Sequence, residues 1–146
     1  MISDAWRLLV IIGLILGLDS IYLNLTSSTY FTTLSQIQKS PIQINWVGAI
    51  IAYLGLILAA YVITGLGLSL GQNFQIPFIN SLLPNLQTQA KNARIYALTF
   101  IFFIIYLVYN GTMLAVFKDY TYKLAAMDTL WGTLLGFIVG YVTQLL

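Results

Sequence analysis

Two aspartates lie inside apolar stretches that are each long enough to cross a lipid bilayer. Asp19 falls within residues 6–25, and Asp128 falls within residues 122–145. An ionisable group at such a place is costly to hold in lipid, so it is expected to face neighbouring helices and often marks a functional site. A buried carboxylate of this kind can carry a proton or bind a cation. A hydrogen bond that only holds two helices together is the structural alternative, and the residues leave both open.

The two carboxylates are predicted to lie at the same depth as an amide. Asp19 and Asp128 are each six residues from one end of their stretch, and Asn110 is seven from the end of residues 94–117. At 1.5 Å per helical residue, all three fall about 9–10 Å below one boundary of the bilayer. Two close carboxylates cannot comfortably both ionise, so one is expected to be protonated and hydrogen-bonded to the other or to a phenol. The predicted binding residues of this layer are Asp19, Tyr22, Tyr106, Tyr109, Asn110, Asp128 and Trp131, with Tyr53 near it.

The composition indicates a multi-pass membrane protein with one domain, residues 1–146. The chain is 60% hydrophobic and 7% charged, with a mean hydropathy of +0.90, whereas a soluble domain is about 25% charged. It contains neither Cys nor His, which excludes thiol chemistry and the commonest metal ligand, so we expect no metal and no cofactor. The net charge of +2 is too small to indicate nucleic-acid binding. The expected partner is the bilayer, and a lipid or small-molecule ligand or a second copy of the chain is compatible with the sequence.

The apolar stretches predict an all-α, antiparallel four-helix bundle in the membrane. Both termini then lie on the same side of the bilayer. Lys and Arg residues divide three against three between the two sides, so they do not decide the orientation. Within residues 26–40, apolar side chains recur at helical spacing and predict a short helix at the interface, ended by Pro41. Residues 71–93 are predicted to skim the interface or form a cap. The predicted spans are residues 6–25, 46–70, 94–117 and 122–145.

Glycines at four-residue intervals predict close helix packing. Gly132, Gly136 and Gly140 follow Asp128 along one face of a helix, and Gly13 and Gly17 form a second such pair in the first span. Small residues at this spacing let another helix approach closely in lipid.

The surroundings of the two aspartates resemble each other. Leu18-Asp19-Ser20-Ile21-Tyr22 and Met127-Asp128-Thr129-Leu130-Trp131 both read apolar, Asp, hydroxyl, aliphatic, aromatic. Their helices are predicted to be antiparallel, so the pattern is consistent with an inverted repeat of the kind that transporters build around a central site.

Several longer motifs resemble one known family of membrane proteins. The carrying residues are Tyr106 to Thr112, Leu114-Ala115, Lys118-Asp119, Met127 to Thr133 and Leu18 to Leu23. They are similar to the signatures of domain-of-unknown-function family 2177, whose members are small four-span membrane proteins of bacteria and large DNA viruses. The resemblance covers most of the chain and implies the same four-span architecture, but it implies no particular reaction.

The chain departs from the family pattern at several of these positions. The family usually reads Tyr-Asp-Leu-Thr-Asn where this chain has Tyr109 to Met113, so the family's Asp is Asn110 here. The family's Trp in the first motif is Tyr22, and its Trp-Pro in the last turn is Tyr120-Thr121. Asp19 and Asp128 match the pattern. A role of the third carboxylate in the family is therefore expected to be altered or absent in this protein.

Three functions are consistent with these residues. The first is a small carrier or channel-like protein with a carboxylate-lined pocket for a proton, a cation or a small lipid-like solute. The second is a lipid-modifying membrane enzyme in which one carboxylate acts as acid or base. The third is a structural or assembly protein that oligomerises through its glycines.

Overall fold

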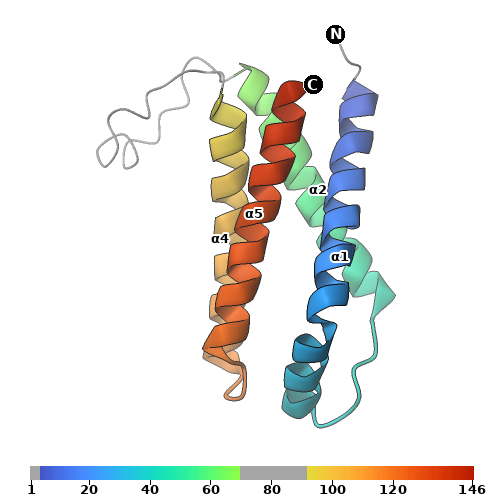
Figure 1. Ribbon diagram of the computed structural model, residues 1–146, viewed down its shortest axis with the longest axis vertical. Helices are drawn as coiled ribbons and strands as arrows, with labels where there is room; N and C mark the ends of the chain where they lie inside the picture. Colours follow the sequence, from blue (N-terminus) through green and yellow to red (C-terminus); the bar gives the residue numbers. More distant parts are fainter. Residues whose placement is uncertain (1–3, 70–91) are drawn as a thin grey trace, which may run out of the picture.

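The computed structural model describes residues 4–69 and 92–146, and these form four α-helices with no strand among them. The helices alternate in direction, so the beginning of α1 and the end of α5 lie at the same end of the molecule (Figure 1). The predicted all-α bundle is thereby confirmed. The helices are α1 (Asp4–Gln38), α2 (Trp46–Ser69), α4 (Ala93–Val116) and α5 (Tyr122–Leu145).

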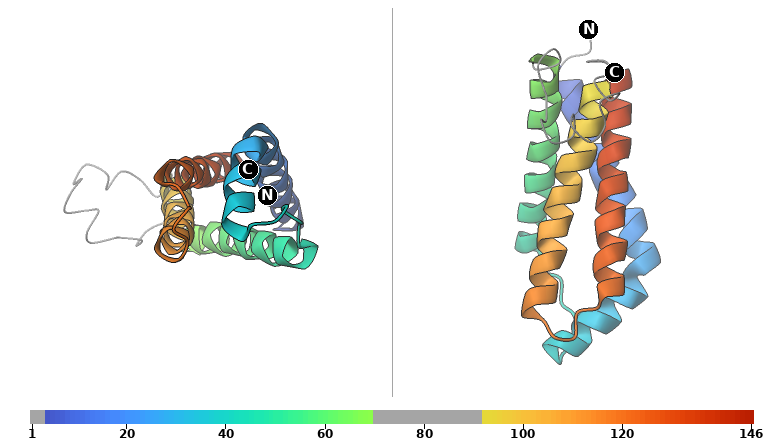
Figure 2. Two further views of the ribbon diagram at one scale, coloured as in Figure 1. Left: turned by 90° about the horizontal axis from the view of Figure 1, so that it is seen from below. Right: turned by 90° about the vertical axis from the view of Figure 1, so that its left-hand side faces the viewer.

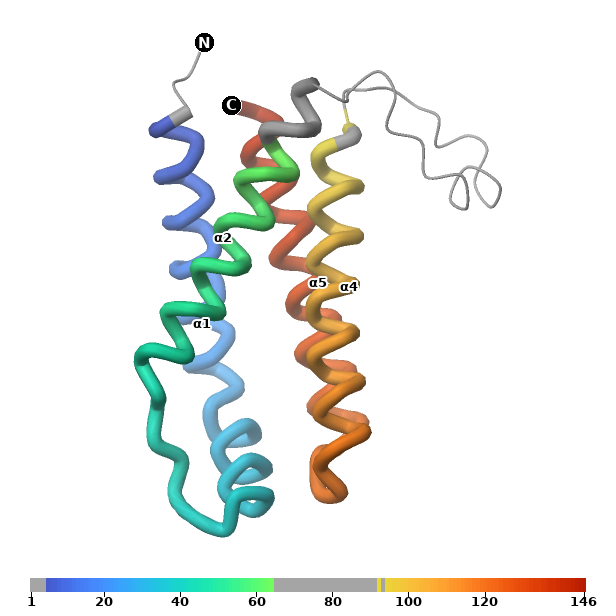
Figure 3. The backbone as a smooth tube through the Cα atoms, turned by 180° about the vertical axis from the view of Figure 1, so that it is seen from behind, coloured from blue at the N-terminus to red at the C-terminus, as the bar shows by residue number. Residues whose placement is uncertain are grey.

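The bundle consists of two helical hairpins. One hairpin comprises α1 and α2, and the other comprises α4 and α5, whose mutual contact is by far the most extensive in the described chain. Seen from below, α1 and α4 occupy opposite corners, with α5 and α2 between them (Figure 2, left). Helix α2 is tilted, so that it starts beside α1 and ends near α4 (Figure 3).

Helix α1 is longer than the sequence predicts. Its 35 residues extend about 52 Å, which exceeds the roughly 30 Å thickness of a bilayer core. Residues 26–38 are helical, as their spacing predicts, but they continue α1 without a break and do not form a helix of their own. The helix ends where Lys39 takes a left-handed conformation with φ of 54°, two residues before Pro41.

Hydroxyl side chains in the polar stretch of α1 bond to carbonyl groups of the same helix. Thr26 Oγ1 donates to the carbonyl of Tyr22 at 2.7 Å, and Thr32 Oγ1 donates to the carbonyl of Ser28 at 2.7 Å. The hydroxyls are thus satisfied within the helix itself, and bonding of this kind also tends to bend a helix. The last part of α1 runs at an angle to the rest of the helix (Figure 2, right).

Two apolar clusters lie at different heights in the bundle. The larger consists of side chains from all four helices, and the smaller has side chains of α1 and α4 packed against it, which ties the hairpins together. The larger is formed by Ile11, Ile15, Ala60, Leu98, Phe102, Leu135 and Val139. The smaller is formed by Tyr120, Leu124 and Ala125, with Tyr30, Leu34, Ile37, Met113, Leu114 and Met127 packed against it.

The glycines of α5 lie against α4. A Cβ on Gly132 would overlap the ring of Tyr106, and one on Gly140 would lie 2.8 Å from the Cα of Ile95. By contrast, Gly13 and Gly17 have no heavy atom within 4 Å of a Cβ position, so the pair predicted in the first span packs against no other helix of the described chain. The seam of glycines thus serves the α4–α5 hairpin alone.

The outer surface of the bundle is apolar. Large side chains such as Leu9, Ile51, Leu107 and Leu130 are all exposed, and each of the four helices is long and apolar enough to cross a membrane. The cap predicted for residues 71–93 lies outside the described residues, apart from its last two positions.

Candidate functional site

Asp128 lies at the centre of a hydrogen-bonded cluster near the beginning of α5. Its side chain is 7% exposed. The Tyr30 hydroxyl of α1 donates to Asp128 Oδ1, and Asn110 Nδ2 of α4 donates to Asp128 Oδ2 at 2.8 Å. The amide of Asn110 is itself fixed, because its Nδ2 also donates to the carbonyl of Tyr106 at 2.9 Å, and the Tyr120 hydroxyl donates to its Oδ1 at 2.6 Å. Asn110 thus presents a donor, rather than a second acid, to the carboxylate.

Asp19 is held in the same way on α1. Its side chain is 8% exposed. The Tyr53 hydroxyl of α2 donates to Asp19 Oδ2 at 2.6 Å, and Trp131 Nε1 of α5 donates to Asp19 Oδ1 at 2.8 Å. The carboxylate therefore joins three helices.

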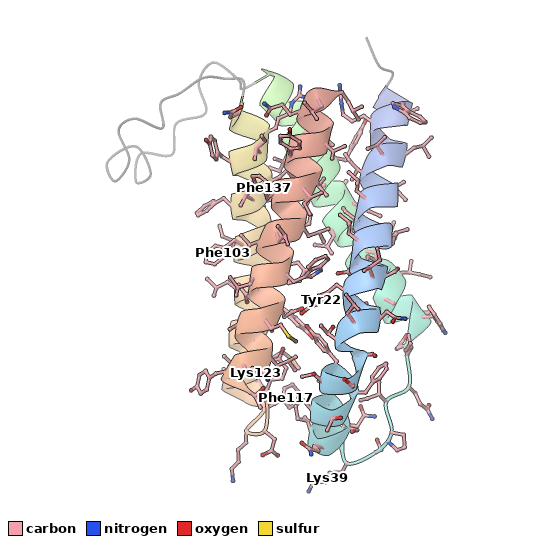
Figure 4. The ribbon with its side chains drawn as sticks, viewed as in Figure 1. Tyr22, Lys39, Phe103, Phe117, Lys123 and Phe137 are labelled. Carbon is pink, nitrogen blue, oxygen red and sulfur yellow. The ribbon has the colours of Figure 1, made fainter. Side chains whose placement is uncertain are left out.

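An aromatic pair joins the two carboxylate clusters. The ring of Tyr22 stacks on the ring of Trp131 with centroids 4.5 Å apart and planes inclined by 4°. The Tyr22 hydroxyl lies 3.4 Å from that of Tyr30, which in turn donates to Asp128. Figure 4 shows Tyr22 between α1 and α5. We call this connected set the polar layer, and its members are Asp19, Tyr22, Tyr30, Tyr53, Asn110, Tyr120, Asp128 and Trp131.

The two carboxylates have matching sets of partners. Each accepts one hydrogen bond from its own hairpin, Tyr53 for Asp19 and Asn110 for Asp128. Each also accepts one from the other hairpin, Trp131 for Asp19 and Tyr30 for Asp128. The polar layer therefore lies across the boundary between the hairpins, and separation of the hairpins would break one bond to each carboxylate.

The resemblance between the two Asp-containing segments corresponds to this arrangement only locally. The aromatic residues that end the two matching segments, Tyr22 and Trp131, are the two that stack. Both hairpins, however, are closed at the same end of the bundle (Figure 1). An inverted repeat would place their closed ends on opposite sides, so the likeness does not extend to whole hairpins.

The predicted site residues are not all in this layer. Asp19, Tyr22, Asn110, Asp128 and Trp131 are in it. The ring of Tyr106 lies against the Gly132 position, and its backbone carbonyl accepts from Asn110. Tyr109 is 52% exposed and is not part of the hydrogen-bonded set.

Three phenols of the layer were not among the predicted binding residues. The sequence predicts Tyr53 near the layer without a binding role, and it does not predict Tyr30 or Tyr120 there. A signal for Tyr30 exists in its spacing: it is eleven residues from Asp19, about three helical turns, so it shares the same face if the helix continues. Tyr120 lies in the turn between α4 and α5, where periodicity carries no information.

The two carboxylates of the layer are surrounded by neutral hydrogen-bond donors. Within residues 4–69 and 92–146, all the donors to the two carboxylates are phenols, an indole and an amide, and neither acid pairs with Lys or Arg. Every carboxylate oxygen accepts one bond, each acid bonds to a phenol, and the acids do not bond to each other. At the edge of the layer, burial and the nearby charge of Asp128 raise the pKa of Tyr120 above its ordinary value, so this phenol remains a donor.

No group of three or more acidic residues that could hold a metal occurs in the described part of the chain.

Fold and site together define a multi-pass integral membrane protein that carries two buried carboxylates between its two helical hairpins. A family described as "Predicted membrane protein (DUF2177)" matches residues 5–145, and the chain belongs to this family. Neither a curated protein nor a solved structure matches the chain.

Proposed function

We propose that this protein is a small membrane carrier or channel-like protein in which Asp19 and Asp128 bind a proton or a cation during passage across the bilayer. One observation supports the proposal above all. Two carboxylates, 8% and 7% exposed, lie between two hairpins in a membrane protein and are solvated only by neutral donors within the described chain.

A purely structural role accounts less well for this arrangement. Neutral residues that hydrogen-bond across the same interface would hold the helices together without an ionised group in lipid. A buried charge without a counter-charge is costly, by several kcal/mol or more. This cost has a functional explanation if each carboxylate binds a proton or a cation during transport, because binding neutralises the charge.

Reconstitution into liposomes tests the proposal. Purified protein is placed in vesicles, and proton, sodium and potassium fluxes are measured under imposed gradients against empty vesicles. We expect flux in wild type and its loss in Asp19→Asn and in Asp128→Asn, because both substitutions keep the shape of the side chain and remove its charge.

The matched control is Asp119→Asn. Asp119 is exposed in the turn between α4 and α5, so its substitution should leave the flux unchanged. Flux no greater than that of empty vesicles under every gradient, or full flux in both buried-site variants, would rule the proposal out. Size-exclusion profiles in detergent establish that each variant is folded.

One observation favours a second candidate, an assembly protein. Gly13, Gly17 and Gly55 have open space at their Cβ positions within the described chain, so another helix could approach the bundle closely there. In that case Gly17→Leu should disrupt oligomers detected by cross-linking in membranes, whereas Asp19→Asn should not. The opposite result excludes this function.

A further inference from the structure

We infer that the species bound in the polar layer is a proton, and that Tyr22 and Tyr30 relay it to Asp128. This inference rests on the proposed function and specifies the substrate of the same site. Its basis is a continuous line of oxygens from two turns of α1 to one carboxylate of α5.

The line consists of two links. The Tyr30 hydroxyl donates to Asp128 Oδ1, and the Tyr22 hydroxyl lies 3.4 Å from the Tyr30 oxygen with either group able to donate. A hydroxyl can accept one proton while it gives up another, so a phenol is able to pass a proton along such a line. The ring of Tyr22 is held by its stacking on Trp131, and this fixes the second phenol of the line in place.

The transfer is balanced at every step. Asp128 Oδ1 gains the proton of Tyr30, the Tyr30 oxygen gains the proton of Tyr22, and the Tyr22 oxygen regains a proton from water. One O–H bond forms for each one that breaks, and the net result is a neutral Asp128 and one proton removed from the aqueous phase. Neither phenol ends with a charge.

The coordination of the carboxylates favours a proton over a metal cation. Each of the four carboxylate oxygens already accepts a hydrogen bond from a fixed donor. An alkali or alkaline-earth ion needs several oxygen ligands at once and would have to displace these donors. A proton needs only one remaining lone pair on one oxygen.

Other titratable groups also lie near Asp128. They come from every element packed around it, and none of them is basic within the described chain. They are Asp19, Tyr22 and Tyr30 of α1, Tyr106 and Tyr109 of α4 and Tyr120 of the following turn.

Infrared difference spectroscopy on the full chain in detergent tests the relay without any transport measurement. A pH jump drives protonation, and the carboxylic-acid C=O band that disappears in Asp128→Asn reports Asp128. We expect the band to rise in wild type, and to rise about 100-fold more slowly in Tyr30→Phe, because a positioned proton donor is lost. Tyr22→Phe should slow it similarly, although the bond between Tyr30 and Asp128 is kept.

Tyr109→Phe is the matched control, since it removes an exposed phenol from α4 near the same carboxylate. Its protonation rate should equal that of wild type. The inference is overturned if Tyr30→Phe and Tyr22→Phe protonate at the wild-type rate, or if no Asp128 band arises at any pH at which the protein is folded. It is also overturned if the vesicles carry sodium or potassium but no protons, an outcome that leaves the carrier intact. Protonation through the phenols with no flux in vesicles supports the relay and refutes the carrier.

Discussion

Replacement of Gly136 by alanine should force α4 and α5 apart. The added Cβ would lie 2.6 Å from the Leu98 carbonyl oxygen and 2.7 Å from Phe102 Cβ, whereas ordinary contact begins at 3.4 Å. The difference, 3.4 − 2.6 = 0.8 Å, is the separation that the two helices must accommodate at this level. Neither neighbour is the movable end of a side chain, so the backbone itself has to shift. Overpacking of this kind destabilises a protein by about 1–3 kcal/mol.

Gly13→Ala provides a matched control on α1. It also replaces a glycine within a helix, but no heavy atom lies within 4 Å of its new Cβ. Both substitutions change the intrinsic helix preference equally, by up to about 1 kcal/mol, and this contribution cancels when the two variants are compared. The free energy of unfolding of Gly136→Ala should therefore fall below that of Gly13→Ala by about 1–3 kcal/mol, the steric contribution alone.

Reversible unfolding in mixed detergent micelles measures this difference. The fluorescence of Trp131 is a suitable signal, because its ring stacks on Tyr22 and its Nε1 donates to Asp19 only in the folded state. The same separation should weaken the bond from Asn110 to Asp128, which joins the same two helices at 2.8 Å. If the two variants have equal free energies of unfolding, within about 0.5 kcal/mol, a Cβ at position 136 does not force α4 and α5 apart.

Two further predictions concern the lower end of the bundle. Ala125 is 6% exposed beneath the last part of α1, whereas Ala126 is exposed. Since the chain has no cysteine of its own, Ala125→Cys should react with a maleimide more slowly than Ala126→Cys, and equal rates would mean that α1 does not cover this end. Lys39 has φ of 54°, a conformation that costs a side chain about 1–2 kcal/mol relative to glycine. Lys39→Gly should therefore raise the free energy of unfolding by up to this amount, and a decrease would contradict the assigned backbone conformation.

The all-α bundle could be predicted from hydropathy because only helices and closed barrels satisfy the backbone in lipid. The end of α1 could not be predicted in this way. Hydropathy reports where a chain leaves lipid, whereas a helix ends where its backbone can no longer continue. Helix α1 continues through a polar stretch, with Thr26 and Thr32 bonded to its own carbonyls, and it stops at Lys39.

The distance of a residue from the end of its predicted span indicates some members of the polar layer and misses others. Their distances to the span ends predict a common height for Asn110 and Asp128, and in the structure the two side chains are hydrogen-bonded. Tyr109 has nearly the same height but is one residue from Asn110, a rotation of about 100°. Once Asn110 faces α5, Tyr109 has to face outward, and it is 52% exposed. Packing determines how a helix is rotated about its axis. A single sequence indicates this rotation only where small residues such as Gly136 mark the face that packs against another helix.

The division of bonds between the hairpins has a consequence for the proposed function. Hydrogen bonds to an ionised acceptor are about twice as strong as those to a neutral one. The bonds from Trp131 to Asp19 and from Tyr30 to Asp128 cross between the hairpins, so they hold the hairpins together most firmly when both acids are charged. Protonation of either acid weakens its cross-hairpin bond, as it weakens the bond within its own hairpin to Tyr53 or Asn110. Proton binding would thus loosen the boundary at which a carrier has to open, and the closely packed α4–α5 hairpin would move as one body against α1.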